Sequence, residues 1–126
     1  MSEFYIYELS NGIRCIHRQT KSGVARCAIM INAGTRDERK GEEGIAHFTE
    51  HGFFKGTTHR KAYQVNCRLE NLGGELNAFT SKEDTTVHAT VLRGDFAKAV
   101  ELIADVVFHS TFPDALLDKE REVILD

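Results

Sequence analysis

The alternation of apolar and polar residues predicts that the chain begins with three β-strands. Two runs rich in β-branched and aromatic residues, 4–9 and 13–19, flank the dipeptide Asn11-Gly12. Asn-Gly between two such runs is the strongest short-range signal for a β-hairpin. A longer apolar run over residues 24–32 predicts the third strand.

The pattern then changes from period two to helical spacing. Residues 35–44 are almost all polar or glycine, which predicts a loop, and residues 44–55 predict a short helix. We expect Ile45, Phe48 and Phe54 to form the buried stripe of that helix. A second helix is predicted over 61–72, with apolar residues at helical spacing: Ala62, Val65, Leu69 and Leu72.

The second half of the chain predicts a strand pair followed by two helices. Residues 75–81 and 85–92 should pair antiparallel. Asp95 can cap a helix over 96–109, whose expected apolar stripe is Phe96, Val100, Ile103 and Val107. A last helix should begin at Pro113, with apolar positions Leu116, Leu117, Val123 and Ile124.

These elements predict one α+β domain over residues 1–126, a mostly antiparallel sheet with helices packed on one face. Because the last helix still runs at Asp126, we expect the chain to be cut from a longer one. Its exposed apolar positions then favour self-association of the fragment.

Composition excludes several classes of function. Sixteen basic and 19 acidic residues give a net charge of −3, so no electrostatic footprint for nucleic acid is present. No apolar run is long enough to span a membrane, and no signal segment is visible, so we expect a cytoplasmic protein without a membrane partner. The three cysteines lack CxxC spacing, which argues against a disulfide framework or a cysteine zinc site.

The stretch His47-Phe48-Thr49-Glu50-His51 carries the candidate chemistry. On a helix, residues four apart lie only about 40° apart around the axis, so His47 and His51 point the same way. Glu50 lies about 60° to the other side of His47, where it can reach the space in front of a metal without binding it. This is the H-x-x-E-H arrangement of a zinc helix, although a helix can also carry these three residues by chance.

The arrangement suits zinc-dependent hydrolysis. Two neutral imidazoles hold Zn²⁺, a third protein ligand leaves one position for water, and a nearby carboxylate takes the proton of that water. Glu50 is the candidate for the last role. The other histidines have no ligand spacing and are expected to be ordinary exposed or hydrogen-bonded residues: His17, His59, His88 and His109.

Several motifs around this stretch resemble the N-terminal region of the pitrilysin/insulinase-type zinc metallopeptidases. They occur in the family's order and span nearly the whole chain: 33–38 (AGTRDE), 44–51 (GIAHFTEH), 54–57 (FKGT), 69–85 (LENLGGELNAFTSKEDT) and 120–125 (EREVIL). The resemblance implies a zinc metalloendopeptidase, of which this chain is about half of the catalytic N-terminal domain. It departs from the family at Gly52, where an apolar residue is usual.

The resemblance also implies roles for individual residues. His47 and His51 would bind Zn²⁺, Glu50 would be the general base, and Glu120 would support the zinc site. The family's third ligand, a glutamate, falls one position beyond Asp126. We therefore expect this chain by itself to be inactive and to bind zinc weakly.

The family further implies a peptide or unfolded polypeptide as substrate. Asn77 and Ala78 match the edge strand that pairs with the substrate backbone, so residues 75–81 should have one unpaired side that faces the His47/His51 helix. Some members of the family are instead non-catalytic structural or substrate-holding subunits, of the processing-peptidase or respiratory core-protein type. Such subunits do not require His47, Glu50 and His51 to be present together.

Overall fold

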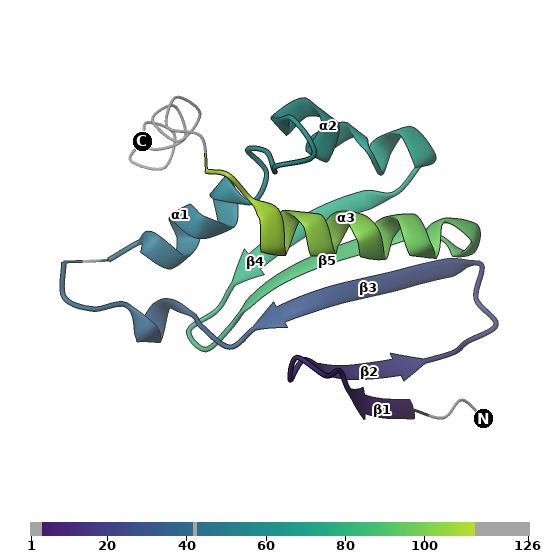
Figure 1. Ribbon diagram of the computed structural model, residues 1–126, viewed down its shortest axis with the longest axis horizontal. Coiled ribbons are helices and arrows are strands. Elements are labelled where there is room, and N and C mark those ends of the chain that lie inside the picture. The colour runs from purple at the N-terminus through teal and green to yellow at the C-terminus, as the bar shows by residue number, and fades with distance from the viewer. Residues whose placement is uncertain (1–3, 42, 113–126) are drawn as a thin grey trace.

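The computed structural model describes residues 4–41 and 43–112. Figure 1 shows a three-stranded sheet with helices above it and a separate two-stranded hairpin below it. The strands are β1 (Phe4–Glu8), β2 (Arg14–Arg18), β3 (Val24–Ile31), β4 (Glu75–Thr80) and β5 (Thr85–Leu92). The α-helices are α1 (Ile45–Gly52), α2 (Ala62–Cys67) and α3 (Phe96–His109), with short 3₁₀ turns at Thr35–Asp37, Glu70–Leu72 and Arg93–Asp95.

The predicted α+β class and the Asn-Gly hairpin are both confirmed. β1 and β2 pair antiparallel, with Ile6 opposite Ile16. The turn between them places Gly12 at φ +91°, a conformation that favours glycine, and the backbone N–H of Ile13 donates to Asn11 Oδ1 at 3.1 Å. The hairpin lies apart from the other sheet (Figure 1).

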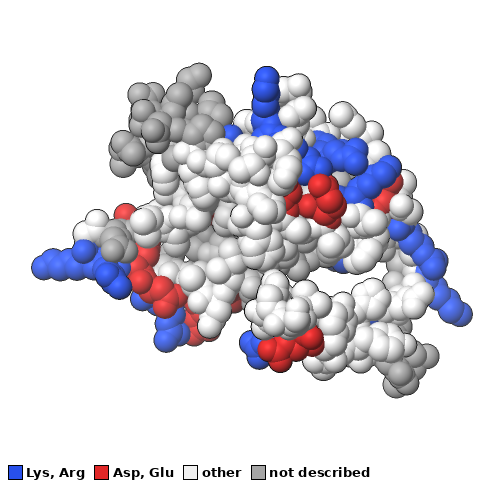
Figure 2. All heavy atoms as spheres, in the orientation of Figure 1, with Lys and Arg blue, Asp and Glu red and all other residues white. Residues whose placement is uncertain are grey.

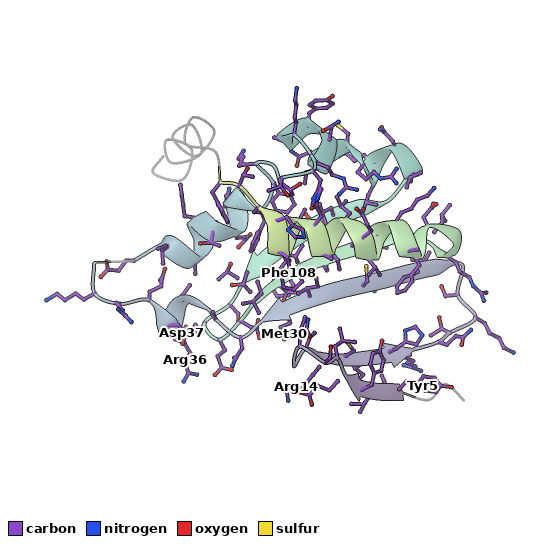
Figure 3. All side chains as sticks on the ribbon, viewed as in Figure 1. Tyr5, Arg14, Met30, Arg36, Asp37 and Phe108 are labelled. Carbon is purple, nitrogen blue, oxygen red and sulfur yellow. The ribbon has the colours of Figure 1, made fainter. Side chains whose placement is uncertain are left out.

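The second sheet has the order β3-β5-β4, and all its pairs are antiparallel. Because side chains alternate between the two faces of a strand, one face carries apolar residues of all three strands against α3. That face, together with α3, forms the core around Val87, Ala89 and Leu102. The opposite face, which includes Met30 of β3 (Figure 3), is not covered by the described helices. The helices therefore lie on one face, as predicted.

The helix predictions are right in kind and wrong in detail. Ile45 is 49% exposed, and Phe53, just beyond α1, takes the buried position because the chain turns into the core there. The helix expected over 61–72 is α2 followed by a separate 3₁₀ turn, and the loop expected over 35–44 begins with another such turn. The helix expected from Pro113 lies outside the described residues.

The apolar stripe of α3 is also displaced. Its bounds match the prediction, but Val100 is 41% exposed, and the buried side chains are Ala99, Leu102, Ile103, Asp105 and Val106. Asp95 occupies the N-cap position without a side-chain capping hydrogen bond, and it instead lies 3.5 Å from Lys98 Nζ.

A tight backbone contact fastens the segment before α1 to the β4–β5 turn. Thr35 N–H donates to the Ser81 carbonyl at 3.1 Å, and Arg36 N–H donates to the Lys82 carbonyl at 3.0 Å. Arg36 and Asp37 lie beside this turn (Figure 3), and Arg36 Nη1 lies 2.6 Å from Glu83 Oε1. Gly34, at the start of the contact, is buried.

Replacing Gly34 with alanine should destabilise the protein through this contact. A Cβ at Gly34 would lie 2.5 Å from the Ser81 carbonyl oxygen and 2.6 Å from the Lys82 carbonyl carbon, and backbone atoms cannot simply move aside. We expect the free energy of unfolding to fall by about 1–3 kcal/mol in a urea titration. Gly23→Ala is the matched control, because a Cβ there meets nothing within 4 Å. Equal stability of both variants would contradict the contact.

Candidate metal centre

Helix α1 brings His47 and His51 together on one side, one helical turn apart. Their Nε2 atoms are 3.0 Å apart, and their rings meet edge to face with centroids 4.5 Å apart. Two nitrogens bound to one tetrahedral zinc at about 2.05 Å would be separated by about 3.3 Å. The pair therefore needs to open by only a few tenths of an ångström to hold a zinc ion, and the neutral imidazole nitrogens are suitable donors.

The surrounding chain fixes α1 at both ends. Gly44, at φ +90°, is the N-cap residue of the helix, and its carbonyl accepts from Phe48 N–H at 2.9 Å. Glu38 Oε2 accepts from Ala46 N–H at 3.0 Å, so a carboxylate satisfies one of the free amides of the first turn. At the other end, Phe53 is buried in the core. These contacts hold the histidine pair on a supported helix.

Glu50 lies on the side of α1 that faces the sheet. Thr80 Oγ1, at the end of β4, donates to Glu50 Oε2 at 2.7 Å. Glu50 is half-buried, and this hydrogen bond ties its carboxylate to the end of β4. A carboxylate held this way is available to accept a proton from a water molecule near the two histidines.

The strand that carries Asn77 and Ala78 is β4, and its position agrees with the expected edge strand. Within residues 4–41 and 43–112, β4 pairs with β5 on one side and with no strand on the other. Helix α1 packs against β4 near its Thr80 end. Asn77 is exposed on the open face of the sheet, whereas Ala78 is half-buried on the face toward the helices.

The remaining site prediction, Glu120, lies outside the described residues. Among the residues that the structure describes, no three histidine, cysteine, aspartate or glutamate side chains form a group that could hold a metal ion. The described part of the site thus supplies two imidazoles and one carboxylate. Among the described residues, no helix is long and apolar enough to cross a membrane.

Sequence reasoning missed a buried carboxylate below the loop that follows α1. Asp105, on α3, is 4% exposed and accepts three hydrogen bonds at 2.7 Å, from Thr57 Oγ1, His59 Nδ1 and Arg60 Nη1. Arg60 also pairs with Glu101. Burial raises the pKa of Asp105, but the hydrogen bonds from Thr57, His59 and Arg60 outweigh it and leave the pKa below its ordinary value. The one signal in the sequence is an aspartate inside the apolar run LIADVV.

This network ties the segment 57–60 to α3. The backbone adds Thr58 N–H to the His109 carbonyl at 3.0 Å and Thr111 N–H to the Gly56 carbonyl at 3.1 Å. His59 is exposed and hydrogen-bonded, as expected for a histidine outside the motif.

Figure 2 shows acidic and basic side chains in small mixed groups on the face of the molecule that it displays, without a broad basic patch.

The sequence matches one protein family and individual members of it. The sequence model of the family described as insulinase (peptidase family M16) matches residues 14–126. The mitochondrial-processing peptidase subunit beta of Dictyostelium discoideum is 40% identical over 98% of this chain and 26% of its own length. Cytochrome b-c1 complex subunit 1 of Bos taurus is 36% identical, again over 98% of this chain and 26% of its own length.

A solved structure agrees with the fold. The crystal structure of a protease from Helicobacter pylori matches with a TM-score of 0.92 and 27% identity, over 98% of this chain and 30% of that one. The chain spans about a quarter of the length of the curated relatives it matches.

The expected cytoplasmic location is wrong. It was inferred from the lack of a visible signal segment, but the similar processing-peptidase and cytochrome b-c1 subunits are named as mitochondrial proteins. A chain that spans about a quarter of its relatives gives no information on segments outside it, so the lack of a signal was not a sound reason.

Proposed function

The chain belongs to the insulinase family, peptidase family M16, and on that premise we propose that it carries the zinc-binding helix and the general base of a zinc metalloendopeptidase. His47 and His51 would hold the Zn²⁺, and Glu50 would act on the attacking water. The observation that carries the proposal is the 3.0 Å distance between the two Nε2 atoms on α1. That distance is close to the separation of two nitrogens on one tetrahedral zinc.

The residues of the chain divide the chemistry between them. Zinc, when bound, lowers the pKa of its water toward ~7 and polarises the peptide carbonyl. Glu50 takes the proton from the water and later delivers it to the leaving amine. Thr80 holds the Glu50 carboxylate in place through its 2.7 Å hydrogen bond.

The substrate would be an extended peptide that adds to the free edge of β4 beside Asn77 and Ala78. Main-chain hydrogen bonds then supply affinity without demanding one sequence. The small side chain of Ala78 allows a close approach of backbones. This docking places the peptide next to α1, since Thr80 of the same strand contacts Glu50.

A second candidate is a non-catalytic subunit of the same family. The similarity to cytochrome b-c1 complex subunit 1 favours it. The presence of His47, Glu50 and His51 in the H-x-x-E-H arrangement favours catalysis, because a purely structural subunit has no need for two convergent imidazoles and a carboxylate on the same helix.

The complete site requires more residues than the described ones. Catalytic zinc sites use three protein ligands plus water, and α1 supplies two. We propose that residues 1–126 form part of a larger catalytic domain, in which a glutamate just after Asp126 would be the third ligand and Glu120 would support it. This chain by itself would then be inactive.

Zinc titration of the 126-residue chain tests the proposal. We expect weak binding, well short of stoichiometric at micromolar protein, and no cleavage of an unfolded polypeptide. His51→Ala should abolish the weak binding, whereas His88→Ala, on the open face of the sheet, is the matched control and should not change it. Equal zinc binding by the His51→Ala variant would overturn the assignment of the pair. Tight binding with cleavage would place the third ligand within residues 1–126.

A further inference from the structure

The alternation of side chains along β4 separates two functions of this strand. Leu76, Ala78 and Thr80 point to the face that carries the helices, and Thr80 contacts Glu50 there. Glu75, Asn77 and Phe79 point to the open face. A peptide that adds to the free edge of β4 would alternate in the same way, so half of its side chains would lie along the open face.

The strand register fixes which side chains are neighbours on the open face of the sheet. Phe79 lies across from Thr86, and Asn77 lies across from His88. Glu75 lies across from Thr90, on whose other side is Arg26. Acidic character at the edge of this face is therefore confined to one end of β4.

Glu75 is suited to contact a docked peptide. It is exposed, and its carboxylate forms no ion pair or side-chain hydrogen bond with any other described residue. Arg26 lies two strands away from Glu75. Two strand spacings amount to about 10 Å, which is close to the Debye length in physiological salt. A side chain directly opposite Glu75 on an added strand would lie only about 5 Å away between Cβ atoms.

We infer that Glu75 selects peptides with a lysine or arginine at the position that pairs with it on the added strand. The inference rests on the proposed docking of an extended peptide at β4 and names the charge that this docking favours. Only one peptide position qualifies. If the register between the peptide and β4 shifts by one residue, the basic side chain turns to the other face of the sheet. A register shift of two residues brings it opposite the neutral Asn77.

Binding of a set of synthetic peptides to the 126-residue chain tests this inference. The probes are short peptides of threonine, valine and serine that differ only in the position of a single lysine, and affinity is read from the amide NMR signals of β4. We expect one lysine position to bind about two- to fivefold more tightly than the others at low salt, the range for opposite charges paired across strands. High salt should remove the preference.

Two variants make the test specific. Glu75→Gln should abolish the positional preference while binding persists. Adding Asn77→Asp to Glu75→Gln should restore a preference two residues nearer the N-terminus of the peptide, because β4 would pair antiparallel with it. A preference that is absent in the wild type, or that survives Glu75→Gln, would overturn the role of Glu75 and leave the proposed function standing. No binding of any probe would overturn the docking at β4 itself, and with it this inference.

Discussion

Replacing Glu50 with glutamine in the proposed larger catalytic domain is expected to lower peptide hydrolysis at least ~10²-fold while zinc stays bound. Glutamine keeps the size of the side chain, and its amide oxygen can still accept the hydrogen bond from Thr80. It cannot take a proton from water. The loss corresponds to at least about 2.7 kcal/mol of transition-state stabilisation.

The measurement is kcat for a peptide together with the zinc content of the same preparation. Glu70→Gln, an exposed carboxylate in the 3₁₀ turn Glu70–Leu72, is the control and should leave both unchanged. Near-normal hydrolysis by a zinc-loaded Glu50→Gln protein would show that another group acts as the base. Loss of zinc from that variant would make Glu50 a ligand instead.

Replacing Asp105 with asparagine should have the largest effect on stability. The change removes the buried charge that pairs with Arg60 Nη1, so that Arg60 keeps only the exposed carboxylate of Glu101 as an ionic partner. We expect the free energy of unfolding to fall by about 3 kcal/mol, measured by urea denaturation. Glu101→Gln is the matched control: Glu101 pairs with the same Arg60, but its side chain is 58% exposed, so the expected loss is only about 0–1 kcal/mol.

The same carboxylate predicts a dependence of stability on pH. Since the pKa of Asp105 in the folded protein lies below its ordinary value of 3.8, folding favours the charged form. The stabilisation is therefore complete above the unfolded pKa and is lost as the pH falls through the lower, folded pKa. The stability difference between the wild type and Asp105→Asn should be constant near neutral pH and should narrow only in the acid range. A difference that narrows between neutral pH and about 5 would contradict this assignment.

The elements of this fold could be predicted because each carries a local signal. The hairpin has its Asn-Gly turn, β5 is rich in threonine and valine, and α3 begins and ends where its spacing indicates. Which face of α3 is buried is not a local property. The set with Val100 and the set with Ala99 both recur at helical spacing, and the packing of α3 against β3 and β5, which buries Ala99, decides between them.

The candidate site also combines contacts that follow from local spacing with contacts that do not. His47, Glu50 and His51 lie within one helical turn, so their mutual placement follows from the helix period. Asp105 and its partners Thr57, His59 and Arg60 are 45–48 residues apart in sequence, and no spacing rule connects them. The hydrogen bond between Thr80 and Glu50 likewise depends on how α1 packs against β4.

The separate hairpin has a consequence for the order in which this chain opens. In the described residues, β1 and β2 pair only with each other, and side chains such as Ile6 and Ile16 are 76% and 68% exposed. A two-stranded hairpin in water is marginally stable at best. Its amide protons should thus exchange with solvent through local opening, at a free energy well below that of the β5 amides, which exchange only when the core around Val87 opens. The chain would behave as two units of unequal cooperativity, and the unit that carries α1 and β4 is the one that stays closed.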